Sequence, residues 1–128
     1  MIIEERMYTL HVHKVPGFLK IYEREGLPII THHLGNMIGF YITEVGMQNM
    51  IVHMWAYENW EDREQHRKRL FSDPAWLAYR VKNEEKILLQ ETRIMRPAPF
   101  FEPVLRAMIR GGSAIRLARK LAAKRKRR

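Results

Sequence analysis

In the stretch IVHMWAYENWEDREQHRKRL (residues 51–70), an apolar and aromatic run passes directly into a block where nearly every side chain is charged. The β-branched and aromatic residues of the first part favour a buried strand over 50–57. Asn59 is a good helix N-cap, and the acidic Glu61 and Asp62 suit the positive end of a helix dipole. The junction therefore predicts a strand that ends near Tyr57 and a solvated helix that begins near residue 60.

The rest of the chain supplies three more strands and one more helical segment on either side of this stretch. Alternating apolar positions predict strands over 2–12, 37–45 and 87–95, the second forming a hairpin with 50–57 through the turn at 46–49. Helical spacing predicts a helix from Pro16 to Leu34 that kinks or breaks at Pro28, because proline cannot donate to the carbonyl of Arg24. The charged helix after residue 60 is expected to break at Asp73-Pro74.

The order of these elements is βαββαβ, which predicts an α+β, ferredoxin-like fold with a four-stranded antiparallel sheet and both helical segments on one face. On the third strand, His53, Trp55 and Tyr57 alternate on one side, and Tyr41 of the neighbouring strand is expected beside them. We expect these rings on the helix-free side of the sheet, where they would form a large apolar patch. The sequence thus predicts a homodimer that packs face to face between sheets.

Composition limits the other classes of function. The chain has 128 residues, which suits a single domain, and it has no Cys, which excludes disulfides and thiolate sites. No apolar run is long enough to span a bilayer, and the acidic start does not fit a targeting peptide. A cytoplasmic location is therefore expected, with a membrane-peripheral location as the alternative. Residues 1–96 carry equal numbers of acidic and basic side chains, so the net charge of +9 belongs to the tail.

The C-terminal segment, residues 104–128, is predicted to be a basic amphipathic tail that follows a domain of residues 1–103. Two short helical pieces are expected, split by Gly111-Gly112. Such a tail suits an anionic membrane surface, while a solubilising role is the alternative. Nucleic acid is an unlikely partner, because few aromatic residues accompany the basic ones.

A set of short motifs, in order from residue 1 to 103, resembles the NIPSNAP family. The matching residues are Glu25, Gly26 and Pro28; Gly35, Gly39 and Tyr41; Gly46 and Asn49; His53, Trp55 and Tyr57; Arg63 and Arg67; and Asp73, Pro74 and Trp76. The resemblance implies the dimeric α/β-barrel fold. It implies no settled activity, and relatives by fold alone include cofactor-independent monooxygenases and small isomerases.

The candidate ligand-binding residues are Tyr41, His53, Trp55, Tyr57, Arg63 and Arg67. The aromatic residues and His53 could line an inter-sheet cavity for a small hydrophobic or aromatic ligand, or they could be packed dimer-core residues. Arg63 and Arg67, at i and i+4, could grip a carboxylate or phosphate at the mouth of the cavity, or cover apolar surface with their stems.

Among the histidines, His53 is the candidate for acid/base chemistry, because an imidazole titrates near neutral pH. The pairs His11/His13 and His32/His33 lack the further ligands that a metal site needs, so neither a metal nor a cofactor is predicted. Three functions remain open: a homodimer that binds a small molecule, a cofactor-independent monooxygenase or isomerase that uses His53, and an interaction protein with a packed cavity and a membrane-associating tail.

Overall fold

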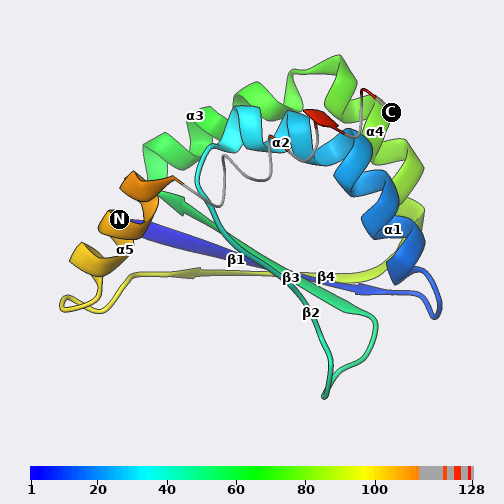
Figure 1. Cartoon of the computed structure of the whole chain (residues 1–128), viewed down its shortest axis with the longest axis horizontal. Helices are drawn as coiled ribbons and strands as arrows, with labels where there is room; N and C mark the ends of the chain where they lie inside the picture. The colour runs from blue at the N-terminus through cyan, green and yellow to red at the C-terminus, as the bar shows by residue number, and fades with distance from the viewer. Residues whose placement is uncertain (113–119, 121–122, 125–126, 128) are drawn as a thin grey trace.

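The sheet has four antiparallel strands in the order β2-β3-β1-β4, as the computed structural model shows (Figure 1). The structure describes residues 1–112, 120, 123–124 and 127. The strands are β1 (Ile2–Leu10), β2 (Met37–Ile42), β3 (Met50–Tyr57) and β4 (Ile87–Met95). This order and the alternation with helices confirm the predicted ferredoxin-like βαββαβ fold.

Two helical segments arch over one face of the sheet (Figure 1). The first runs through α1 (Val15–Ile21), the π-helical turn η1 (Tyr22–Gly26) and α2 (Leu27–Leu34); the second runs through α3 (Trp60–Phe71), α4 (Pro74–Asn83) and the 3₁₀ turn η2 (Glu84–Lys86). The predicted N-cap is present, since the side-chain oxygen of Asn59 accepts a 2.8 Å hydrogen bond from the amide of Asp62. The predicted break at Pro74 is also present.

The predicted interruption at Pro28 takes the form of a π-helical turn, and the helical path continues through it. A wider turn accommodates the missing donor of Pro28 without ending the helix. Gly26, at the end of this turn, faces the ring of Tyr79 so closely that an added Cβ would lie 2.7 Å from Tyr79 Cζ. The glycine therefore allows α4 to pack against η1.

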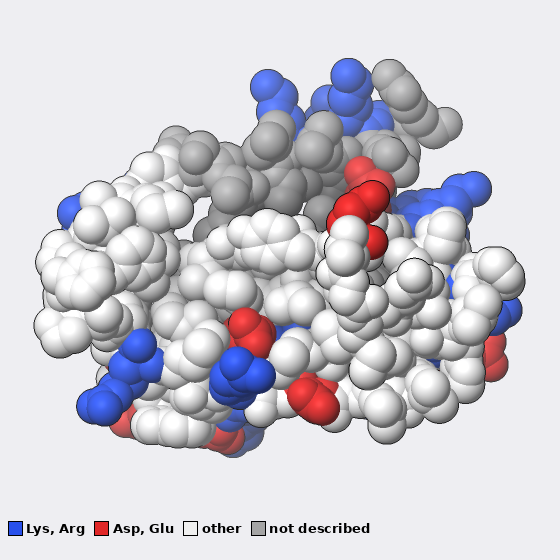
Figure 2. Space-filling model, turned by 90° about the horizontal axis from the view of Figure 1, so that it is seen from below, with Lys and Arg blue, Asp and Glu red and all other residues white. Residues whose placement is uncertain are grey.

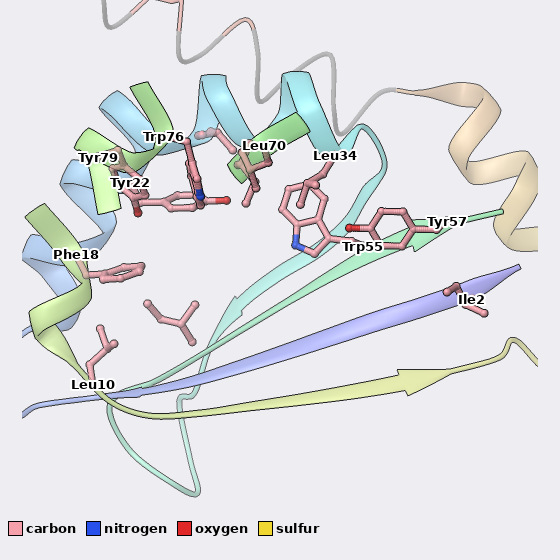
Figure 3. Close-up of a cluster of buried hydrophobic side chains, with 13 residues drawn as sticks. Ile2, Leu10, Phe18, Tyr22, Leu34, Trp55, Tyr57, Leu70, Trp76 and Tyr79 are labelled. Atoms are coloured by element: carbon pink, nitrogen blue, oxygen red, sulfur yellow. The ribbon is translucent and has the colours of Figure 1, made fainter. Parts of the chain in front are cut away.

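The strand register decides which side chains face the helices. Glu4 pairs with Trp55 and Arg6 with His53, so these four residues share one face of the sheet. Trp55 is 0% exposed, and it lies in the core cluster drawn in Figure 3, below the side chains of the helices. The prediction that His53, Trp55 and Tyr57 lie on the helix-free face is therefore wrong: they are buried between the sheet and the helices of their own chain.

A fifth helix, α5 (Glu102–Gly111), follows the last strand. Its Leu105 is buried against Ile3 and Ala56, which occupy the opposite face of the sheet from Trp55. The predicted boundary at residue 103 thus falls inside a helix that packs on the domain, and Gly112 ends that helix with a φ of +62°. The second predicted helical piece lies largely outside the described residues, and the membrane contact of segment 104–128 stays a prediction.

None of the helices in the described part of the chain is both long and apolar enough to cross a bilayer.

Candidate functional site

A row of polar side chains on β1 faces the helices. Glu4, Arg6 and Tyr8 alternate along the strand and therefore point to the same side. Glu4 is 0% exposed, so its carboxylate has lost its contact with bulk water. A buried carboxylate is costly unless charged or polar groups compensate it.

Three arginines surround that carboxylate, and we call Glu4, Arg6, Arg63 and Arg67 the Glu4 cluster. Arg63 donates to Glu4 Oε2 from Nε at 2.8 Å and also from Nη2. Arg67 Nη1 lies 3.5 Å from Glu4 Oε1, and Arg6 Nη1 lies 3.7 Å from Glu4 Oε2. The cluster therefore sets three guanidinium groups against one buried carboxylate.

His53 lies beside this cluster in a fixed tautomer. The indole Nε1–H of Trp55 donates a 2.7 Å hydrogen bond to His53 Nδ1. Because Nδ1 accepts, the proton of the neutral imidazole resides on Nε2. Burial, followed by the positive charges of Arg6 and Arg67, lowers the pKa of His53 to about 3. His53 is thus a neutral side chain that presents an N–H, and its Nε2 has no hydrogen-bond partner in the described part of the chain.

A cavity of about 90 Å³ lies between the sheet and the helices, with His53 in its wall. The sheet supplies Tyr8, His53, Ile87 and Gln90, and the helical segments supply Phe18, Tyr22, Ile30, Trp76, Tyr79, Arg80, Asn83 and Glu84. Figure 3 shows the rings of Phe18, Tyr22 and Tyr79 pointing from the helices into the interior above the sheet. We call this space the helix–sheet pocket.

Two further polar atoms in this wall are buried and have no hydrogen-bond partner among the described residues. They are the hydroxyl of Tyr22 and the indole Nε1 of Trp76. Burial raises the pKa of Tyr22 well above its usual value, which keeps the phenol protonated. The hydroxyl of Tyr79, in contrast, accepts a 2.9 Å hydrogen bond from Asn83 Nδ2. Unpaired buried polar atoms are uncommon in native proteins and indicate a missing partner.

The predicted site residues divide into two groups. His53, Trp55, Tyr57, Arg63 and Arg67 come together on the helix side of the sheet. Tyr41 does not join them, since it pairs with Val52 on the opposite face and is 60% exposed.

Phe40 takes the place predicted for Tyr41. Its ring stacks on His53 with the centroids 5.4 Å apart.

Sequence reasoning missed Glu4, Arg6 and Tyr8, although a signal was present. Glu4, Arg6 and Tyr8 occupy every second position of the predicted first strand, so alternation puts their side chains on one face of the sheet. It also missed the contribution of Tyr22, Trp76 and Tyr79, because aromatic residues at helical spacing indicate a packed helix face and do not by themselves indicate a pocket.

The described residues contain no group of three or more His, Cys, Asp or Glu side chains placed to hold a metal ion.

Comparison with known proteins identifies the family. The sequence model of NIPSNAP matches residues 3–102. The chain belongs to the NIPSNAP family. Two solved structures support this: the NIPSNAP family protein with unknown function Atu4242 from Agrobacterium tumefaciens, and an uncharacterized NIPSNAP domain protein from Burkholderia xenovorans. The first is 41% identical over 78% of this chain and 90% of its own, with a TM-score of 0.77. The second is 38% identical over 78% and 97%, with a TM-score of 0.75.

Outside the NIPSNAP proteins, the chain is similar in fold to a putative antibiotic biosynthesis monooxygenase from Nitrosomonas europaea. That structure is 12% identical, covers 76% of this chain and 98% of its own, and has a TM-score of 0.56. A likeness at this level of identity shows a shared fold, and a shared fold does not imply a shared reaction. No curated protein matches the sequence.

The low pKa of His53 makes stability depend on pH. As the pH falls below 6.5, the unfolded chain takes up a proton at this histidine before the folded chain does, so stability present above pH 6.5 is lost toward pH 3. The loss is about 1.4 kcal/mol per pH unit, or about 2 kcal/mol between pH 6.5 and 5. Urea unfolding at pH 6.5 and at pH 5 measures the free energy of unfolding that each protein loses between these values. His53→Phe should lose about 2 kcal/mol less than the wild type. Equal losses in the wild type and His53→Phe would contradict the assigned pKa.

Proposed function

We propose that this NIPSNAP protein binds a small, mainly apolar ligand in the helix–sheet pocket of each chain. The observation that supports this most strongly is the Nε2–H of His53, which is buried at the wall of a cavity without a partner. Leaving a buried donor unpaired costs about 1–3 kcal/mol. A hydrogen-bond acceptor on a ligand would recover that free energy.

The size and walls of the pocket limit the ligand. Pockets for drug-sized ligands have volumes of about 300–1,000 Å³, whereas the volume of this cavity is about 90 Å³. Half of the lining residues, counting His53, carry an aromatic ring, and rings prefer offset or edge-to-face contacts with other rings. A single planar ring or a short acyl chain therefore suits the space better than a larger molecule, and a packed interior that serves only protein interactions is less well supported.

His53 is better suited to donating a hydrogen bond than to acid/base catalysis. Its Nδ1 lone pair is engaged by Trp55, and its pKa of about 3 is far from the neutral range in which a general base works best. A neutral histidine with a lowered pKa can polarise an oxygen atom through its N–H. The monooxygenase or isomerase hypothesis with His53 as the base is therefore not favoured.

Native mass spectrometry of protein purified from its own cells tests ligand binding. We expect an additional small mass on each wild-type chain and its loss in His53→Phe, which removes the donor. His32→Phe is the matched control, because His32 is exposed on α2 and should retain the bound mass. Tyr22→Phe removes only an unpaired hydroxyl, and it should lower occupancy without affecting folding. Wild-type protein without any bound mass would contradict the proposal.

We also propose that two chains associate through the part of the sheet face opposite α1–α4 that α5 leaves uncovered. Tyr41 and Leu89 are exposed there, and Met7 and Val52 are half-buried on the same face. The charged residues Glu5, Glu91 and Arg93 lie on the same face. Figure 2 views the molecule from the sheet side, where uncharged residues cover much of the described surface around a few charged side chains. An apolar face of this kind is typical of a protein interface.

Sedimentation equilibrium tests this association. The expected mass is twice that of the 15.4 kDa chain, and Val52→Glu should shift it to a single chain by placing a charge in the interface. Val12→Glu, at an exposed position beyond the end of β1, should leave the dimer intact. A wild-type monomer would contradict the proposed assembly.

A further inference from the structure

We propose that the helix–sheet pocket selects a ligand whose acceptor is an oxygen anion, namely the carboxylate of a small aromatic or acyl acid. The inference rests on the proposed binding function and names the class of ligand. It depends on two features of the described residues: the chemistry of the unpaired atoms in the wall, and the charges that surround them.

The unpaired atoms in the pocket wall are all able to donate. His53 presents Nε2–H, Trp76 presents its indole N–H, and the hydroxyl of Tyr22 can donate as well as accept. His53 is 2% exposed, so its donor has no access to bulk water. A group that satisfies several donors at once must offer several lone pairs, and a carboxylate offers about four lone-pair sites.

Trp55 is the positioning residue of this arrangement. By donating to Nδ1 at 2.7 Å, it holds the imidazole in the tautomer whose proton is on Nε2. Without this bond the ring could turn or exchange tautomers and offer a lone pair to the pocket instead.

The charges beside His53 favour an anion over a neutral acceptor. The Glu4 cluster holds three guanidinium groups around one buried carboxylate, and the second acidic partner of Arg63 is Glu64, which is exposed. Arg67 reaches Glu4 only at 3.5 Å, and its guanidinium lies over the ring of Phe71. The cluster therefore sets three part-buried positive charges against one fully buried negative charge.

The positive electrostatic potential of the Glu4 cluster extends to the helix–sheet pocket. Arg6 donates to the hydroxyl of Tyr8, which lines the pocket, and both Arg6 and Arg67 contribute to lowering the pKa of His53. Arg80 and Glu84 also line the pocket, and they form an ion pair at 3.5 Å, so their charges offset each other. A neutral N–H donor in a positive field binds an anionic acceptor more strongly than a neutral one, because hydrogen bonds to ionised groups are about twice as strong.

Benzoate and benzamide form a matched pair of probes, since they share ring and shape and differ in charge. Calorimetric titration of the full chain with each should show benzoate binding about tenfold more tightly. Arg67→Met keeps an unbranched apolar stem but removes the charge, and it should reduce the ratio of the benzamide to the benzoate dissociation constant to about threefold or less. Arg69→Met, at an exposed position on the same helix, should keep the full preference.

Other outcomes separate the inference from the proposed function. Equal or tighter binding of benzamide would overturn the preference for an anion and leave ligand binding in place. If neither probe binds, the chemical identity of the molecule that copurifies with the protein tests the inference. A carboxylic acid would support it, and a neutral compound would overturn it. Absence of binding by both probes and of any copurified molecule would overturn both.

Discussion

Replacing Glu4 with Gln is expected to lower the free energy of unfolding by about 3 kcal/mol. The substitution keeps the size of the side chain but removes the buried negative charge that faces Arg6, Arg63 and Arg67. Removing one partner of a buried ion pair costs about 3–5 kcal/mol. We expect the lower end of this range, because the three arginines keep 15–19% exposure and water can partly solvate them. Equilibrium urea unfolding at fixed chain concentration measures the change.

Glu5→Gln is the matched control for this experiment. Glu5 is the next residue on β1, lies on the opposite face of the sheet, and contacts Arg93 only at 3.9 Å. Its replacement should cost at most about 1 kcal/mol, as for other surface ion pairs. Similar losses for Glu4→Gln and Glu5→Gln would contradict the role of Glu4 as the buried counterion of the cluster.

Replacing Gly26 with Ala is expected to lower the free energy of unfolding by a similar amount. The added Cβ would meet the Tyr79 ring at 2.7, 2.9 and 3.0 Å; the first two distances are closer than real Cβ atoms come to a neighbour, and the third is tighter than nine in ten such contacts. Tyr79 cannot easily retreat, because its ring packs on Trp76 and its hydroxyl is bonded to Asn83. Overpacking of this kind costs about 1–3 kcal/mol, and the crowding of three ring atoms favours the upper end.

Gly17→Ala, measured by the same unfolding experiment, should change stability in the opposite direction. Gly17 lies in α1, and an added Cβ there would meet nothing within 4 Å. Alanine in a helix is favoured over glycine by about 0.5–1 kcal/mol. A neutral or stabilising effect of Gly26→Ala would contradict the tight packing between η1 and α4.

Most of the fold could be predicted because its signals are local. The apolar run that ends at Tyr57 and the cap at Asn59 define the end of β3 and the start of α3, and both lie where they were expected. The effect of Pro28 on the helix could not be predicted from local signals. Whether a proline ends a helix or widens one turn depends on the packing around that turn. Here Tyr79 packs against Gly26 and the helical path continues.

The site was predicted only in part, because alternation separates two faces of a strand without showing which one the helices cover. His53 and Trp55 were correctly placed together, but on the wrong side of the sheet. Tyr41 was misplaced because the sequence does not determine the register of β2 against β3: Ile42 pairs with Ile51, so Tyr41 lies opposite Val52. A shift of one residue moves a side chain to the other face, so Phe40 opposes His53 instead.

The most direct test of this account is the nitrogen-15 NMR spectrum of the His53 side chain. The structure requires a neutral imidazole with the proton on Nε2, with Nδ1 accepting from Trp55, and this state should persist from pH 8 to pH 5 because burial lowers the pKa of His53 to about 3. A proton on Nδ1, or a charged imidazolium within that range, would contradict the proposed pocket.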